Sequence, residues 1–204
     1  EDDLEEFIAG PTQTKPVGNL DAGSSDLELG TEAGNGNDPQ LIGMRFQNIP
    51  VSKGSVIQSA KIQFTVDELK SQAAASYIIK AQSGIDPLPF DANIPFNISS
   101  RPVFQDSILW NVSADNWLTA GEAGPDQLTP DLTSLLQAII DQDGWVAGQS
   151  AVFTIYGTGC KVAESYDGSP DQAPQLAHWA AARLAARFAR VVAALARMKP
   201  DPPR

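Results

Sequence analysis

The stretch SAKIQFTVDE, Ser59–Glu68, is the clearest strand signal in the chain, and it decides the fold class. Ile62, Phe64 and Val66 alternate with Lys61, Gln63, Thr65 and Asp67 along it. A period of two places alternate side chains on opposite faces of a strand, one toward a core and the other toward solvent. One buried and one solvated face is typical of antiparallel sheets.

Similar short apolar segments recur along the chain, separated by turn-forming residues. The chain holds 16 glycines and 15 prolines, which suits a loop-rich β fold better than a helical bundle. Thr31–Pro39 reads as a turn cluster, and the proline-rich stretch from Asp86 to Arg101 reads as a long connection. The first of these segments is Asp3–Gly10, which Pro11 follows. The further predicted strands are Ser25–Gly30, Gln40–Phe46, Ser76–Gln82, Ile108–Val112, Ser150–Gly157, Lys161–Tyr166 and Ala173–Trp179.

A single helix interrupts this pattern after Thr129, which would cap a helix that begins at Pro130 and ends at Gly144. Its apolar residues fall on one face, namely Leu132, Leu135, Leu136, Ile139 and Ile140. Roughly nine short strands with one inserted α-helix predict a mainly β chain, an antiparallel β-sandwich of jelly-roll type.

The C-terminal stretch departs from the β pattern. We predict a β-sandwich over 1–179, a C-terminal amphipathic helix over 180–199 and a proline-rich end over 200–204. The apolar face of the helix, proposed for assembly, includes Leu184, Phe188, Val191 and Leu195. This helix would dock on the acidic body or on a second copy. Contact with a membrane surface and an extension foreign to the module are the alternatives.

Charge is distributed unevenly along the chain. Up to Leu176 there are 8 basic and 24 acidic residues, and from Ala177 onward there are 6 basic residues and one acid. An acidic body repels phosphates, so nucleic acid is not an expected partner. Cys160 is the only cysteine, which excludes an internal disulfide, and we expect it to be buried. The start at Glu1, without Met, is consistent with a processed, secreted protein.

Seven stretches carry a resemblance to a known module. They are EDDLEE, SSDLELG, IGMRFQNIPVSKGSVIQSAKIQFTVDE, FNISSR, WNVSADNW, GEAGPDQLTPDLTSLLQAIIDQDGW and AESYDGSPDQAPQL. In this order they resemble a β-sandwich module that recurs in large secreted proteins of marine bacteria and some algae, often beside adhesion or glycan-related domains. The resemblance implies an extracellular, non-enzymatic role.

The residues offer little for catalysis. His178 is the only histidine, and no nucleophile motif lies near it, so we expect it to be structural. Carboxylate pairs such as Asp67 with Glu68, or Glu164 with Asp167, could serve glycoside chemistry. Adjacent acids at strand ends are more often solvated or paired with arginine, so we predict that the chain is not an enzyme. A glycan-processing enzyme is the third of three functional hypotheses.

Acidic residues near predicted strand ends suggest a structural calcium ion, although no cofactor is required. Hard cations prefer carboxylate and carbonyl oxygens, and Asp26, Glu28 and Asp67 are the candidate ligands. A buried carboxylate can instead pair with one of the few basic residues of the body. We predict such an internal ion pair between Arg45 and Glu164.

Aromatic and polar residues in loops suggest a carbohydrate site. Trp117 in SADNWLTAG, together with Tyr166 and Asp167 in ESYDGSPDQAPQL, are the candidates, whereas Trp110 and Trp145 are expected in the core. We expect the ESYDGSPDQAPQL stretch itself to form a closing hairpin. Asn97 and Asn111 lie in Asn-X-Ser sequons and are candidate glycosylation sites in a eukaryotic secreted protein.

These observations favour a non-enzymatic extracellular or cell-surface module for adhesion or for matrix or filament assembly. The expected partners are further copies of the chain or other extracellular proteins. A carbohydrate-binding module that recognises a polysaccharide is the alternative.

Overall fold

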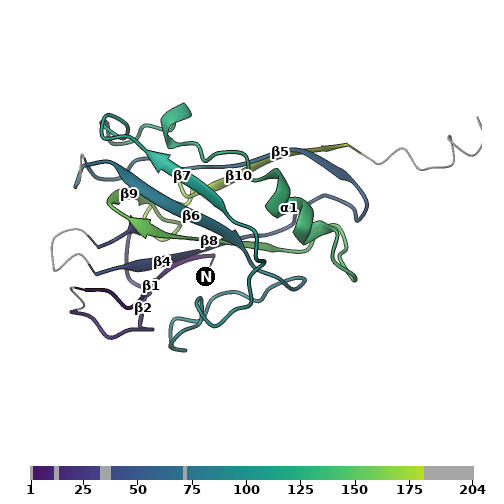
Figure 1. Ribbon diagram of the computed structural model, residues 1–204, viewed down its shortest axis with the longest axis horizontal. Coiled ribbons are helices and arrows are strands. Elements are labelled where there is room, and N and C mark those ends of the chain that lie inside the picture. Colours follow the sequence, from purple (N-terminus) through teal and green to yellow (C-terminus); the bar gives the residue numbers. More distant parts are fainter. Residues whose placement is uncertain (1, 12–13, 33–37, 71–72, 182–204) are drawn as a thin grey trace, which may run out of the picture.

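The computed structural model describes residues 2–11, 14–32, 38–70 and 73–181. The chain is mainly β and folds as an antiparallel sandwich of two layers with one α-helix, which confirms the predicted fold class (Figure 1). The C-terminal helix predicted over 180–199 lies outside the described residues, except that the last strand reaches Ala181. Within the described ranges, no helix combines the length and the apolar character that crossing a bilayer requires.

The first layer is a six-stranded sheet, spread from top to bottom across Figure 1. All of its neighbouring strands are antiparallel. In spatial order its strands are β2 (Leu20–Asp21), β1 (Asp3–Phe7), β4 (Gln40–Phe46), β8 (Ala151–Thr158), β6 (Ala75–Ala81) and β7 (Ile108–Val112).

The second layer is built around β5 (Val56–Gln63) and the residues that follow it. β5 pairs with β10 (Gln175–Ala181), and β3 (Asp26–Gly30) pairs with β9 (Cys160–Glu164). A bridge between Val66 and Ala163 joins the two pairs into one layer. The opposite edge of β5 is covered by the segment 127–132, whose backbone bonds to Ala60, Ile62 and Phe64.

The stretch ESYDGSPDQAPQL, which was predicted to be a closing hairpin, is a loop between two strands that pair with the same edge of one segment. Glu164 donates its backbone N–H to Thr65 at 3.0 Å, and Gln175 pairs with Gln63. β9 and β10 therefore lie end to end along the same edge of the β5 segment, and they do not pair with each other. The hairpin prediction was wrong because both strands share a partner, which the local sequence does not reveal.

The core lies between the two layers. Ile62, Phe64 and Val66 are completely buried, as their alternation predicts. Trp110 stacks on Phe64 with a centroid distance of 5.6 Å. Trp145 and Cys160 are also buried, which confirms both predictions, and burial raises the pKa of the Cys160 thiol to about 12.

The predicted helix exists but begins later than expected. α1 spans Thr133–Ile140 and follows a short 3₁₀ turn, η1 (Pro125–Gln127). The N-cap residue of α1 is Leu132, whose side chain makes no capping bond, and the Asp131 carboxylate just before it accepts the Thr133 N–H at 3.1 Å. Thr129 is instead used as an edge partner of β5, and its hydroxyl accepts the Ile62 N–H. The five apolar residues of the predicted helical face are all buried.

β1 carries three buried carboxylates that bind backbone N–H groups of distant segments. Glu5 accepts the N–H of Glu28 at 2.6 Å, and Glu6 accepts those of Ile98 and Ser99 at 2.8 and 3.0 Å. Asp3 accepts the Tyr166 N–H at 2.9 Å. Buried polar groups are generally hydrogen-bonded, and here they tie β1 to three parts of the chain.

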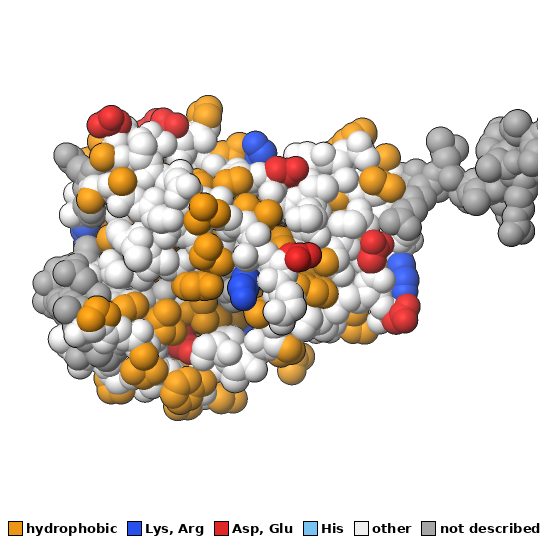
Figure 2. Space-filling model, viewed as in Figure 1, with side chains coloured by type: hydrophobic (Ala, Val, Ile, Leu, Met, Phe, Trp, Pro, Cys, Tyr) orange, Lys and Arg blue, Asp and Glu red, His pale blue; other side chains and the backbone are white. Residues whose placement is uncertain are grey.

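The long connection predicted from Asp86 to Arg101 packs on the outer face of the six-stranded sheet, where Phe90 and Ile98 join Leu4 and Val152 in a small buried cluster. Hydrophobic side chains are also visible on the surface of the molecule in Figure 2. Phe90 packs over Gly43, where a Cβ would lie 2.6 Å from the ring. Arg101 lies over the Phe90 ring at 4.4 Å and donates to the carbonyls of Leu88 and Pro89. The loop is thus fixed on the sheet.

Candidate functional site

One edge of β10 is open. β5 directs the N–H groups of Ala60, Ile62 and Phe64 toward the segment 127–132, and the Ile57 N–H donates to Gln137 of α1. The groups of Ser59, Lys61 and Gln63 face β10. The pairing has one register shift, between Trp179 and Ala180, where Gln58 of β5 is the extra residue. Alternation along β10 is therefore kept, and it places the N–H and C=O groups of 176, 178 and 180 on the far edge. No strand among the described residues pairs with that edge.

Two adjoining pockets follow this edge, and we call them together the β10 groove. The first, of about 250 Å³, lies between Tyr166, Leu176 and His178 on one side and the end of β4 on the other. The second, of about 290 Å³, lies between His178, Trp179 and Ala180 and the segment 50–55. His178 lines both pockets, so they form one groove along the edge of β10. Along this edge the His178 Nδ1 lies 3.5 Å from the Leu176 carbonyl oxygen.

The polar wall of the groove is organised by Arg45. Its guanidinium donates to Asp2 Oδ1 at 2.8 Å, to the Pro87 carbonyl at 2.8 Å and to Ser150 Oγ at 2.9 Å. The predicted Arg45–Glu164 ion pair is therefore wrong. Arg45 lies on β4 in the first layer and Glu164 lies in the second layer beside Asp26, and the sequence could not reveal that separation.

Tyr166 is the predicted aromatic candidate that does reach a pocket. Its side chain is 51% exposed, and its backbone is held by Asp3 at the rim of the groove. Asp167 is exposed on the same loop. These two candidates are thus accessible, and Tyr166 presents an aromatic face next to Arg45 and His178.

Trp117, by contrast, is not a surface residue. It is only 2% exposed, and its indole N–H donates to the Asp126 carbonyl at 3.1 Å. Its backbone has φ 65°, a left-handed turn that directs the ring toward Phe64 and Trp110. The prediction of an exposed Trp117 was wrong because the surrounding polar residues suggested a solvated loop.

Trp179 is the accessible tryptophan, and sequence reasoning missed it. Its side chain is 62% exposed on β10. The signal was available in QLAHWAA, where Trp179 shares the outward face of the strand with Gln175 and Ala177. His178, the sole histidine, points to the inward face of β10 and is half-buried.

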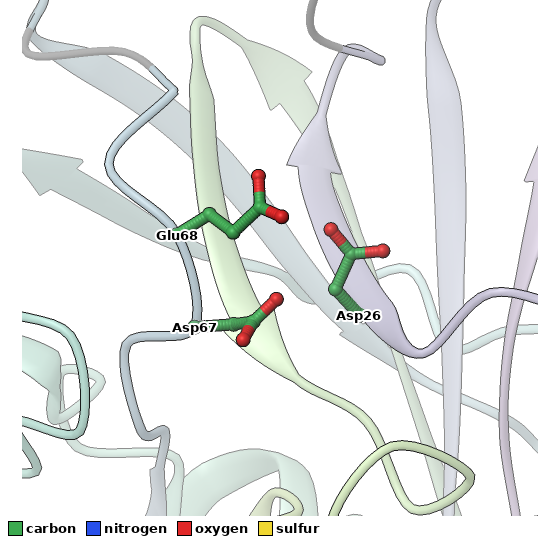
Figure 3. Close-up of side chains that lie close together, drawn as sticks. All are labelled: Asp26, Asp67 and Glu68. Carbon is green, nitrogen blue, oxygen red and sulfur yellow. The ribbon is translucent and has the colours of Figure 1, made fainter.

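A cluster of carboxylates lies at the other end of the second layer. Asp26, Asp67 and Glu68 have carboxylate oxygens within 4.8 Å of one another. In Figure 3 these side chains point toward one another, Asp26 from β3 and the other two from the segment after β5. The fold thus brings together two of the three predicted metal ligands and adds Glu68.

Lys70 provides a positive charge to this cluster. Its ammonium lies 3.1 Å from Glu28, 3.3 Å from Glu68 and 3.4 Å from Asp26. Burial lowers the pKa of Lys70, but its hydrogen bond to Glu28 and the nearby carboxylates outweigh this and raise it. Glu28, the third predicted ligand, is therefore bound to lysine.

The cluster still holds more negative than positive charge. Burial, followed by the charges of Asp26 and Glu68, raises the pKa of Asp67. Burial, followed by the charges of Asp67 and Asp26, raises the pKa of Glu164. Asp26, Asp67 and Glu68 together form an oxygen donor set of the kind that hard cations such as calcium prefer.

The two sequon asparagines have hydrogen-bonding roles. Asn97 Oδ1 accepts the Asp91 N–H and an Arg101 N–H, both at 3.0 Å. Asn111 Oδ1 accepts the Ser76 hydroxyl at 2.8 Å on the edge strand β7. Glycosylation of either residue stays a prediction. The proposed assembly residues Leu184, Phe188, Val191 and Leu195 lie outside the described residues.

Comparison of the chain with protein-family models and with curated proteins found no match. The resemblance to secreted sandwich modules therefore stays a prediction that rests on the sequence motifs.

Proposed function

We propose that the chain is a non-enzymatic module of an extracellular or cell-surface protein, and that it serves adhesion or assembly through contacts with other polypeptides. The observation that carries this proposal is the open edge of β10 beside the exposed Trp179. Natural sheets protect edge strands with lysine, proline or bulges that twist the edge away. β10 has seven residues without lysine, arginine, acid or proline, and the one irregularity of its pairing with β5 lies between Trp179 and Ala180.

The basic stretch that follows β10 supports the same role. From Ala177 onward the sequence carries 6 basic residues and one acid, whereas the rest of the chain is strongly acidic. Opposite charges favour an encounter between this stretch and the body of another copy. Leu184, Phe188, Val191 and Leu195 are the residues proposed to contribute apolar contacts.

Light scattering on the chain over a concentration series tests this function. The chain of 204 residues is expected to gain mass with concentration, and a version that ends after Ala181 is expected to gain less. If both chains stay monomeric at every concentration, the assembly function is refuted.

The β10 groove favours a second candidate function, the binding of a polysaccharide. Tyr166 offers a half-exposed ring for stacking on a sugar, and Arg45, Asp2 and Gln47 line the same pocket with polar groups. Pull-down with a panel of polysaccharides should show binding that Tyr166→Ala abolishes. Trp117→Phe is a matched control, because that ring is buried. Binding that survives Tyr166→Ala would refute this site.

A structural calcium ion is proposed for the carboxylate cluster of Asp26, Asp67 and Glu68. Bound there, calcium would neutralise carboxylates that the fold holds close together. This proposal does not depend on the assembly function.

A further inference from the structure

We propose that β10 pairs antiparallel with β10 of a second copy of this chain, about a two-fold axis that passes beside His178. The inference rests on the proposed function, and it names both the partner and the register of the contact. It begins from the open backbone edge, where the N–H and C=O groups of residues 176, 178 and 180 point away from β5.

The outward backbone groups of residues 176, 178 and 180 are arranged symmetrically about His178. If His178 faces His178 of the second copy, Leu176 faces Ala180 in both halves of the ladder. Each facing pair is then a hydrogen-bonded pair of an antiparallel ladder, which exchanges both N–H···O bonds. The N–H and C=O groups of β10 in each copy therefore bond to the same groups of the other copy, as a two-fold interface requires.

The outward side chains fit this register. Ala177 of one copy then lies opposite Trp179 of the other, in a pair without backbone hydrogen bonds, where side chains approach most closely. A small residue opposite a large one leaves room for the indole. Both tryptophans, now 62% exposed, would be covered in part.

Charge opposes a second copy less at this strand than over the acidic body of the chain. Each copy has a net charge of −11, so most faces of two copies repel each other. β10 brings no carboxylate of its own to the contact. Lys61, its neighbour on β5 and opposite Ala177, is basic. An approach at β10 thus keeps the acidic residues out of the pairing strands.

The area of the contact indicates a weak dimer. Covering the exposed part of two tryptophans would remove about 300 Å² from water, and stable interfaces bury about 1,200 Å² or more. The backbone ladder adds hydrogen bonds, but each contributes little net free energy in water. Dimerisation is therefore expected at high concentration, and more strongly when several modules are linked in one protein.

Disulfide cross-linking of the full chain tests the register. His178→Cys places two thiols directly opposite each other, so mild oxidation should give a covalent dimer. Ala180→Cys alone should give none, but mixed with Leu176→Cys it should give a mixed dimer. The unmodified chain is the control, because Cys160 is buried. Equal cross-linking of His178→Cys and Ala180→Cys, each alone, would overturn the register.

Sedimentation over a concentration series tests the edge itself. His178→Pro removes an N–H group that β5 does not use, and it should abolish dimers while a thermal melt reports whether the fold persists. Trp179→Ser, on an exposed side chain, should weaken the dimer at least several-fold without affecting the fold. Leu109→Ser is the matched control, since Leu109 is 54% exposed on the other edge strand, β7, and its dimer should match that of the unmodified chain.

The outcomes separate this inference from the proposed function. If the chain associates and both β10 variants associate equally well, contact through β10 is refuted while assembly stands. If β10 binds only a different polypeptide and never a second copy, adhesion stands and the two-fold contact is refuted. A chain that stays monomeric and binds no polypeptide refutes both.

Discussion

Glu5 should make the stability of this protein fall as the pH rises from about 5 to about 8. The residue is 1% exposed in β1. Burial, partly offset by the hydrogen bond from the Glu28 N–H and reinforced by the charges of Glu28 and Asp26, raises the pKa of Glu5 from 4.5 to about 8. The folded state therefore holds this proton more tightly than the unfolded state does.

The sign and size of the effect follow from proton linkage. Between the two pKa values the folded chain binds more protons, so the free energy of unfolding decreases with pH. The contribution is fully present below the unfolded pKa of 4.5 and is lost as the pH rises through the folded pKa of about 8. At about 1.4 kcal/mol for each pKa unit, the whole loss is about 5 kcal/mol.

The perturbation that isolates this group is Glu5→Gln. Glutamine keeps an oxygen that accepts the Glu28 N–H, but it does not ionise. Urea unfolding at a series of pH values from about 5 to about 9 should show a loss of several kcal/mol for the unmodified chain and a flatter profile for the variant. Glu122→Gln, at an exposed position, is the control.

Two results would contradict this reasoning. Parallel profiles for the unmodified chain and Glu5→Gln would mean that Glu5 ionises in the folded state as readily as in the unfolded state. A profile that rises with pH, and that the variant flattens, would mean that Glu5 is stabilised as a carboxylate.

Four further predictions follow from individual contacts. Trp117→Ala should destabilise the fold by about 3–5 kcal/mol in urea titrations, and a loss under about 1 kcal/mol would contradict its burial. Glu6→Ala should cost about 1–3 kcal/mol for each N–H left without an acceptor at Ile98 and Ser99, and unchanged protection of those amides in hydrogen exchange would contradict this. Calcium should raise the melting temperature and a chelator should lower it, whereas Asp67→Asn should remove the response; an identical response in the variant would exclude the cluster. Glu164→Gln should stabilise the protein at neutral pH, because burial raises the pKa of Glu164, and a lower urea midpoint would contradict this.

The strands were predictable because their signal is local. Gln40–Phe46 and Ile108–Val112 were predicted with the bounds that the structure has. The alternation of apolar and polar residues in these strands indicates one face toward the core and one outer face. Neighbouring turn residues mark the ends of the strands. The same logic placed Ile62, Phe64 and Val66 in the core.

The failures share a cause, namely that the partner of each residue lies far away in the sequence. Arg45 on β4 binds Asp2, which precedes the neighbouring strand β1. Glu164 lies opposite Asp26. Neither partner can be read from the neighbouring residues. Trp117 failed for a related reason, because one left-handed backbone conformation reversed the direction of its side chain.

The candidate site was predictable only in part. Tyr166 was named because it lies beside a turn, and the same signal also named Trp117, which is buried. The β10 edge was missed because an unpaired edge is a property of the sheet order and not of the strand. The acidic cluster was predicted in part, since Asp26 and Asp67 were named as calcium ligands and Glu68 as the acid beside Asp67, whereas the ammonium of Lys70 was not foreseen.

The loop between β9 and β10 can vary in length without changing the strand pairing on either side of it. Glu164 reaches Thr65 and Gln175 reaches Gln63, so only the place opposite Phe64 separates the two strands along the shared edge. A single residue could span that gap, yet the chain inserts Ser165–Pro174. The length of this insertion is therefore independent of the register of the sheet. Residues can be added to the exposed part of this loop beyond Tyr166, whose N–H Asp3 binds, while the pairing of β9 and β10 stays the same.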